Sequence, residues 1–290
     1  MDFEGFLNQC WDEHATHTAA VAERLARQGP ALVTEEAQIA PLAHLVHHVH
    51  GEHLGRWHEG LALLRLLAAH PACSPGAAAS AALARFQASL ALCEGSADER
   101  AAMSASDRIR VTALAAANLA ERDTARASAL FGEALAEADR AGLDATDATN
   151  RALAVTANNL ACTLEEKAQR SPAERALMIA AAQAARRFWA VAGTWLETER
   201  AEYRLAMTWL QAGDAALARH HAQQCLDIVD ANDGAALERF FAWEAIGLAA
   251  RGGGDATGHV QALQMARTAF AALDEADQGW CRASLDKLAG

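Results

Sequence analysis

The fold is decided by a pattern that first reads Leu114-Ala115-x-x-Asn118-x-x-x-Arg122-Asp123-x-x-x-Ala127-x-x-x-Phe131-x-x-Ala134. The same spacing returns, without a gap, as Leu205-Ala206-x-x-Trp209-x-x-x-Gly213-Asp214-x-x-x-Ala218-x-x-x-Ala222-x-x-Cys225. Each copy has a large and a small residue side by side, then a short turn, then small residues at helical spacing. A pattern that recurs in this way predicts repeated pairs of α-helices joined by turns.

The first helix of the pattern recurs in two further places and more weakly in a third. The clear copies are Leu160-Ala161-x-x-Leu164 and Ile246-Gly247-x-x-Ala250, and the weak copy comprises Val49-His50 with Ala62, Leu66, Ala69 and Pro71. The clear anchors, at positions 114, 160, 205 and 246, lie 46, 45 and 41 residues apart. Small residues at crossing points let helix axes approach to about 8–10 Å. Because each pair leaves one apolar face uncovered, neighbouring pairs are expected to stack.

The pattern resembles the tetratricopeptide repeat (TPR), with helices and turns lengthened beyond that repeat's usual length of about 34 residues. The resemblance covers residues 104–274 well and residues 34–72 loosely. It implies an all-α fold, a right-handed α–α superhelix built as a solenoid of stacked antiparallel helix pairs. Residues 1–100 are then an N-terminal His-rich helical region packed on the array, and residues 101–290 are the repeats with a C-terminal capping helix. An irregular α-helical bundle is the alternative.

The composition points to the same fold class and excludes several functions. The 290 residues include only 5 Ile and 9 Val, too few for a β-sheet core. A net charge of −12 argues against nucleic-acid binding, which needs a basic face. The N-terminus lacks a signal-peptide pattern, and no apolar stretch is long enough to cross a bilayer. We therefore expect no nucleic-acid partner and no membrane partner.

The cysteines indicate the redox state of the compartment, and the absence of catalytic motifs argues against enzyme activity. The six cysteines are Cys10, Cys73, Cys93, Cys162, Cys225 and Cys281, and no two of them form a C-x-x-C motif. We therefore expect buried free thiols, as in a protein of a reducing, bacterial-type cytoplasm. The sequence has no phosphate-binding glycine loop after a strand and no nucleophile elbow. We therefore expect no enzyme activity and no cofactor.

Local signals place the individual helices. One helix is predicted over residues 2–28, ended by Gly29-Pro30, and Pro41 is expected to start or to kink the next. Helices follow over 57–69 and 77–92, and residues 94–107 are a linker or a short helix. The repeat pairs are predicted over 104–121 with 123–142, 148–168 with 172–191, 196–211 with 214–230, and 236–250 with 255–273, and the last helix over 277–288. The strongest start signal is Ser171-Pro172-Ala173-Glu174.

Histidines cluster near the N-terminus in a pattern that could bind a metal ion. Residues 44–53 read His-Leu-Val-His-His-Val-His-Gly-Glu-His. In a helix His44 and His48 share one face, as do His14 and His17. If the two helices pack antiparallel, these four imidazoles could face each other and bind zinc, iron or nickel. The chain has no H-E-x-x-H motif, however, so hydrogen-bonded core histidines and solvated ones are the other interpretation.

The TPR resemblance also implies a concave groove lined by the first helix of each pair. The aligned positions place eight residues there: Asn158, Asn159, Arg200, Tyr203, Arg204, Met207, Gln211 and Glu244. Asn side chains can pair with a peptide backbone, and Arg can bind a carboxylate. The matching positions of the first repeat, Thr112, Ala113 and Ala116, leave the basic clamp of peptide-binding relatives incomplete. Alternatively, Arg200 and Arg204 pair with Glu197, Glu199 or Glu202 at a repeat interface.

Three functions follow from these observations. The first is a non-catalytic scaffold that binds a protein or peptide partner in the groove of the TPR-like solenoid. The alternative is a metal-binding or metal-regulated helical protein that uses the histidine cluster. A sensor of a small ligand or peptide is the third. The sequence leaves the oligomeric state open, and its seven tryptophans leave room for an aromatic dimer patch.

Overall fold

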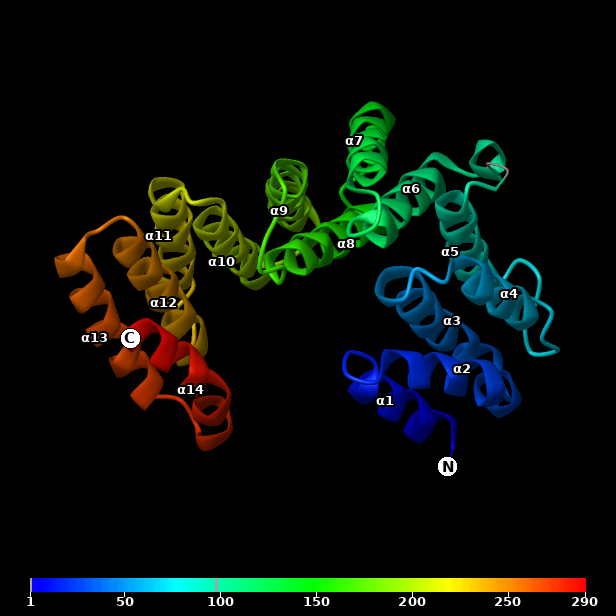
Figure 1. The fold of residues 1–290 in the computed structure, drawn as a ribbon, viewed down its shortest axis with the longest axis horizontal. Coiled ribbons are helices and arrows are strands. Elements are labelled where there is room, and N and C mark those ends of the chain that lie inside the picture. Colours follow the sequence, from blue (N-terminus) through cyan, green and yellow to red (C-terminus); the bar gives the residue numbers. More distant parts are fainter. Residues whose placement is uncertain (1, 97–98) are drawn as a thin grey trace. The chain divides into compact units, whose positions relative to one another are not determined.

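The computed structural model describes residues 2–96 and 99–290, and this part of the chain is all-α (Figure 1). Fourteen α-helices follow one another through the described residues, which contain no β-strand. The all-α prediction is therefore confirmed. The chain divides into two compact units, Met1–Leu143 and Asp144–Gly290. The sequence placed the start of the repeats at residue 101, which lies within the N-terminal unit. Of the predicted linker over 94–107, residues 97 and 98 lie outside the described residues, and Glu99–Ala102 is a short 3₁₀-helix (η3).

The N-terminal unit contains seven α-helices in its described residues: α1 (Phe3–Glu13), α2 (Thr18–Leu32), α3 (Ile39–His47), α4 (Trp57–Ala68), α5 (Ala78–Glu94), α6 (Ala105–Leu119) and α7 (Thr124–Ala141). A 3₁₀-helix, η1 (Glu36–Gln38), precedes α3, and a π-helix, η2 (His48–His53), continues it. Apolar side chains of α1 to α5 form one core, in which Leu25, Leu42 and Leu64 are fully buried.

The prediction of a single helix over residues 2–28 is wrong, because two helices occupy this stretch. The first ends at Glu13, whose carbonyl accepts hydrogen bonds from the N–H groups of Thr16 (3.2 Å) and His17 (2.8 Å) and so closes a turn. The second continues past the predicted stop at Gly29-Pro30 to Leu32. Pro30 is tolerated there because it removes only one backbone donor, and the helix ends two residues later.

The C-terminal unit contains the other seven helices: α8 (Ala148–Glu165), α9 (Pro172–Ala192), α10 (Trp195–Ala212), α11 (Ala215–Ala231), α12 (Ala236–Gly252), α13 (Ala256–Ala271) and α14 (Glu275–Ala289). The predicted bounds agree with these to within three residues because the caps are encoded locally. Ser171 and Glu174 form the predicted capping box at the start of α9. Gly213 takes a left-handed φ of 86° between α10 and α11, and Asp214 then accepts a hydrogen bond from the N–H of Leu217 (2.9 Å).

Packing in the C-terminal unit follows the order of the helices. Contacts join α8 to α9, α10 to α11 and α12 to α13, and the next contacts join α9 to α10 and α11 to α12. The first helices of the pairs also meet, since α10 contacts both α8 and α12. Repeat positions at these contacts are fully buried small residues such as Ala206, Ala218 and Ala222. This succession is compatible with a helical repeat solenoid.

All six cysteines are unpaired, and Cys10, Cys93, Cys225 and Cys281 are buried. Burial raises the pKa of Cys93 to about 12. Among the described helices, none combines the length and the apolar composition that crossing a lipid bilayer requires.

Candidate functional site

A cavity of about 470 Å³ opens in the C-terminal unit between the first helices of successive pairs and the last helix. Its lining comes from four helices, α8, α10, α12 and α14, and comprises Asn158, Glu199, Arg200, Tyr203, Arg204, Leu237, Glu238, Phe241 and Trp280. Four of these, Asn158, Arg200, Tyr203 and Arg204, are residues that the repeat pattern predicted for a groove. The structure thus brings half of the predicted set to one cavity.

Helical spacing explains why three residues of α10 meet at this cavity. Arg200, Tyr203 and Arg204 are three and four residues apart, so their side chains leave the helix on one face. The aromatic wall extends from Tyr203 to Phe241, with ring centroids 5.5 Å apart, and from Phe241 to Trp280, 5.3 Å apart. Trp280 is 66% exposed, and it is among the most exposed large apolar side chains in the described residues. An exposed indole beside a cavity offers a flat apolar surface to a ligand.

The two arginines of the wall are paired with glutamates of other helices. Arg204 donates to Glu165 of α8 at 2.5 Å, and Arg200 lies 3.3 Å from Glu238 of α12. The alternative expectation, pairing with glutamates of α10, is therefore wrong. The guanidinium of Arg204 is half-buried, whereas the Arg200 side chain is 61% exposed. Arg200 is thus the cation of the wall that a ligand in solution can reach.

Glu199 is a buried acid in the cavity wall. Only 1% of its surface is exposed, and its Oε1 accepts a hydrogen bond from the Sγ of Cys225 at 2.8 Å. Its Oε2 is buried without a hydrogen-bond partner. Burial raises the pKa of Glu199 to about 7, and the nearby carboxylate of Glu238 adds to the effect. This side chain therefore titrates near neutral pH.

The other four predicted groove residues do not line the cavity. Glu244 is buried and accepts a hydrogen bond from the Tyr203 hydroxyl (3.0 Å), and burial raises its pKa. Asn159 is exposed on α8, and Met207 packs on the apolar core of α12 to α14. Gln211 accepts a hydrogen bond from Arg170 at 2.5 Å.

Sequence reasoning missed five residues of the cavity wall: Leu237, Glu238, Phe241, Trp280 and Glu199, the last of which it named only as a possible partner of the arginines. The first three are on the early turns of α12, upstream of the anchor at position 246, where no repeat position was assigned. A signal for them does exist, because Leu237 and Phe241 are four residues apart and so share a helix face. Trp280 was assigned only to a capping helix, and nothing in its neighbourhood in the sequence indicates a cavity.

The N-terminal histidines are only partly grouped as the sequence suggested. His14 and His48 come together, and a third imidazole, that of His53, joins them. His17 instead contacts the hydroxyl of Thr16 through Nδ1 (2.9 Å). His44 stacks on Phe86 with ring centroids 5.9 Å apart, and burial lowers its pKa.

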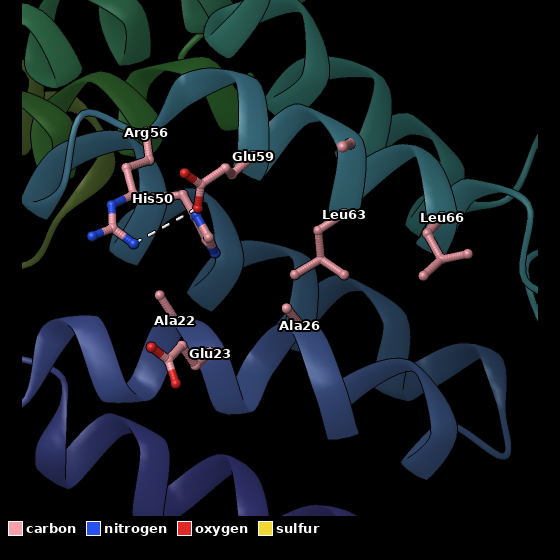
Figure 2. Close-up of a pocket in the computed structure, with 9 residues that line it drawn as sticks. Ala22, Glu23, Ala26, His50, Arg56, Glu59, Leu63 and Leu66 are labelled. Atoms are coloured by element: carbon pink, nitrogen blue, oxygen red, sulfur yellow. Dashed lines mark ion pairs between the residues drawn. The ribbon is translucent and has the colours of Figure 1, made fainter.

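A second cavity, of about 450 Å³, lies in the N-terminal unit between α2 and α4 (Figure 2). Figure 2 shows His50 between Arg56 and Glu59, above Ala22 of α2. His50 is 3% exposed, and neither of its ring nitrogens has a hydrogen-bond partner. Because burial lowers its pKa, this imidazole is neutral at pH 7. The remaining lining combines the charged Glu23, Arg56 and Glu59 with alanine and leucine side chains and contains no aromatic residue, unlike the first cavity.

Comparisons of the chain with protein-family models, with curated proteins and with solved structures find no match. The functional assignment therefore rests on the residues and geometry of the chain itself.

Proposed function

We propose that the chain is a non-catalytic, TPR-like interaction scaffold that binds an extended peptide segment of a partner protein in the cavity between α8, α10, α12 and α14. The observation that carries this proposal is the convergence of Asn158, Arg200, Tyr203 and Arg204, all derived from the repeat pattern, on one cavity beside the exposed Trp280. The repeats would continue as a right-handed superhelix of helix pairs. Unpaired cysteines fit a reducing compartment such as the cytoplasm.

The cavity wall suits a peptide because it offers both apolar and polar contacts. An apolar side chain of the peptide would enter between Phe241 and Trp280, where it removes aromatic surface from water. The Asn158 amide, with both a donor and an acceptor, would pair with the peptide backbone. Arg200 would bind a carbonyl or carboxylate of the peptide.

The ion pair of Arg200 does not prevent this contact. The pair is separated by 3.3 Å, and its arginine is 61% exposed. Glu238 is only 10% exposed, so the pair is best kept. A guanidinium has five N–H donors, and Arg200 can therefore bind a ligand group with its exposed donors while it stays paired with Glu238.

A displayed peptide library selected on the full chain tests the proposal, followed by calorimetry with the enriched peptides. We expect Trp280→Ala and Arg200→Ala each to weaken binding by about 10-fold or more, as for central interface residues. The control variants Val260→Ala and Arg267→Ala remove one exposed apolar and one exposed basic side chain of α13, outside the cavity, and should leave the affinity unchanged. The proposal is wrong if no peptide is enriched, or if enriched peptides bind the two cavity variants as tightly as the parent.

A further inference from the structure

Three histidines of the N-terminal unit meet because the chain leaves α-helical geometry after α3. In an α-helix, residues five apart point about 140° away from each other. Residues His48–His53 instead form a π-helix, in which the N–H of Leu54 donates to the carbonyl of Val49 at 3.0 Å. The wider turn brings the two end residues, His48 and His53, onto one face, with ring centroids 4.5 Å apart. Such π-turns are frequent at functional sites.

The third histidine comes from the end of α1. His14 follows the last residue of α1, and its ring centroid lies 5.1 Å from that of His48 and 5.2 Å from that of His53. One ligand atom from each of the three histidines lies within 4.8 Å of the other two. The Nε2 atoms of His48 and His53 are already 3.0 Å apart. Two nitrogens on a tetrahedral Zn²⁺ ion are separated by about 3.3 Å, given Zn–N bonds of about 2.0–2.1 Å.

Hydrogen bonds fix the proton position on two of the three imidazoles. The Nδ1 of His48 contacts a carboxylate oxygen of Glu52 at 2.9 Å, and the Nδ1 of His14 contacts the carbonyl of Trp11. Both partners are acceptors, so Nδ1 carries the proton in each ring and Nε2 keeps its lone pair. A histidine that donates Nδ1–H to a carboxylate or carbonyl is the usual arrangement behind a metal-binding Nε2.

The surrounding structure holds the cluster in place. The guanidinium of Arg122 donates to the carbonyls of Glu52 (2.9 Å) and His53 (2.7 Å) and so clamps the end of the π-helix. The ring of Trp11 packs against those of His14 and His48, with centroids 5.1 and 5.4 Å away. Ligands held by packing and hydrogen bonds on helical elements lose little freedom when a metal binds.

We propose that His14, His48 and His53 bind one divalent transition-metal ion, with Zn²⁺ as the metal that three imidazoles fit best. Three neutral imidazole nitrogens satisfy three of four tetrahedral positions. The fourth position faces the solvent side, because His53 is exposed, and it would hold a water molecule. Binding shifts the proton of His53 from Nε2 to Nδ1, since the Nε2 lone pair must be free to bind the metal. This site lies in the other unit from the peptide cavity and does not depend on it.

Metal titration of the full, untagged chain tests the inference. After chelator treatment, we expect one equivalent of Zn²⁺ to bind by calorimetry, and one equivalent of Co²⁺ to give the visible absorption of a tetrahedral site. The variants His14→Gln, His48→Gln and His53→Gln should each lower the Zn²⁺ affinity by about 100-fold or more.

The matched control is His17→Gln, which changes a nearby histidine of the same region that lies outside the cluster. It should bind Zn²⁺ as the parent does, and circular dichroism should show parental helix content in all four variants. The inference fails if the parent takes up no stoichiometric metal, if the Co²⁺ spectrum is octahedral, or if His17→Gln weakens binding as much as His53→Gln. The first two readouts need no variant, so a variant that fails to fold does not decide the outcome.

Discussion

Glu199 makes the stability of the C-terminal unit depend on pH in an unusual direction. An unperturbed glutamate has a pKa near 4.5, and burial raises that of Glu199 to about 7 in the folded chain. Between these values the folded state binds more protons than the unfolded state, so stability falls as the pH rises. The contribution of this side chain to the free energy of unfolding is greatest below pH 4.5 and is lost as the pH rises through 7. The full difference of about 2.5 pKa units corresponds to about 3 kcal/mol.

The variant Glu199→Gln isolates this effect because an amide does not titrate. Its Oε1 can still accept the hydrogen bond from Cys225, and any cost of the buried amide is the same at every pH. As the pH rises from 5.5 to 8, the free energy of unfolding of the variant should increase by about 2 kcal/mol relative to that of the parent. For a unit of this size the difference between the two melting temperatures should grow by about 4–8 °C.

Thermal melts followed by circular dichroism at half-unit steps of pH measure this difference. Arg200 and Glu238 also face Glu199, so both proteins are compared at constant ionic strength. The exposed Glu166→Gln in the same unit is the control, and its profile should run parallel to that of the parent. A constant gap between the melting temperatures of Glu199→Gln and the parent would refute the reasoning, whatever the size of that gap.

Three further predictions follow from local contacts. Gly55 has a φ of 61°, and an added Cβ would lie 2.1 Å from Nε of Arg122. In urea unfolding, Gly55→Ala should therefore lower the free energy of unfolding by about 2 kcal/mol more than the control Gly76→Ala, where the added Cβ meets open space at a φ that is also positive. Glu52→Gln should lower the affinity of the histidine cluster for Zn²⁺ by about 10–100-fold in a competition assay. An unchanged affinity would show that this carboxylate does not support metal binding. Ser171→Ala removes the cap of α9 and should lower the free energy of unfolding by about 1 kcal/mol, with no change in Zn²⁺ affinity.

The helices of the C-terminal unit could be placed from the sequence because their start and stop signals are local. Ser171, Pro172 and Glu174 fix the start of α9 through contacts within one turn, and Gly213 with Asp214 fixes the next boundary. The break between α1 and α2 carries no such signal. Large apolar residues are missing between Trp11 and Val21, but residues 12–17 contain neither glycine nor proline, and packing of the two helices in the folded unit decides that the chain turns there.

The residues of the candidate sites could be grouped from the sequence where the chain follows α-helical spacing. Arg200, Tyr203 and Arg204 share a face in any α-helix, so they could be grouped before the structure was known. Trp280 reaches the same cavity only through tertiary packing of α14. His53 was missed for a different reason: the expectation assumed 3.6 residues per turn, and the π-helix changes which positions lie side by side.

The fully buried alanines at the helix contacts restrict the residues that these positions accept. Ala206 and Ala222 have no exposed surface, and both lie in the core cluster formed by α10, α11, α12 and α13. Glycine at either position would remove a buried methyl group and cost about 1 kcal/mol in helix propensity, and a branched side chain would force neighbouring helices apart, at about 1–3 kcal/mol for each site. During evolutionary drift, a change of side-chain size in either direction would therefore destabilise this unit.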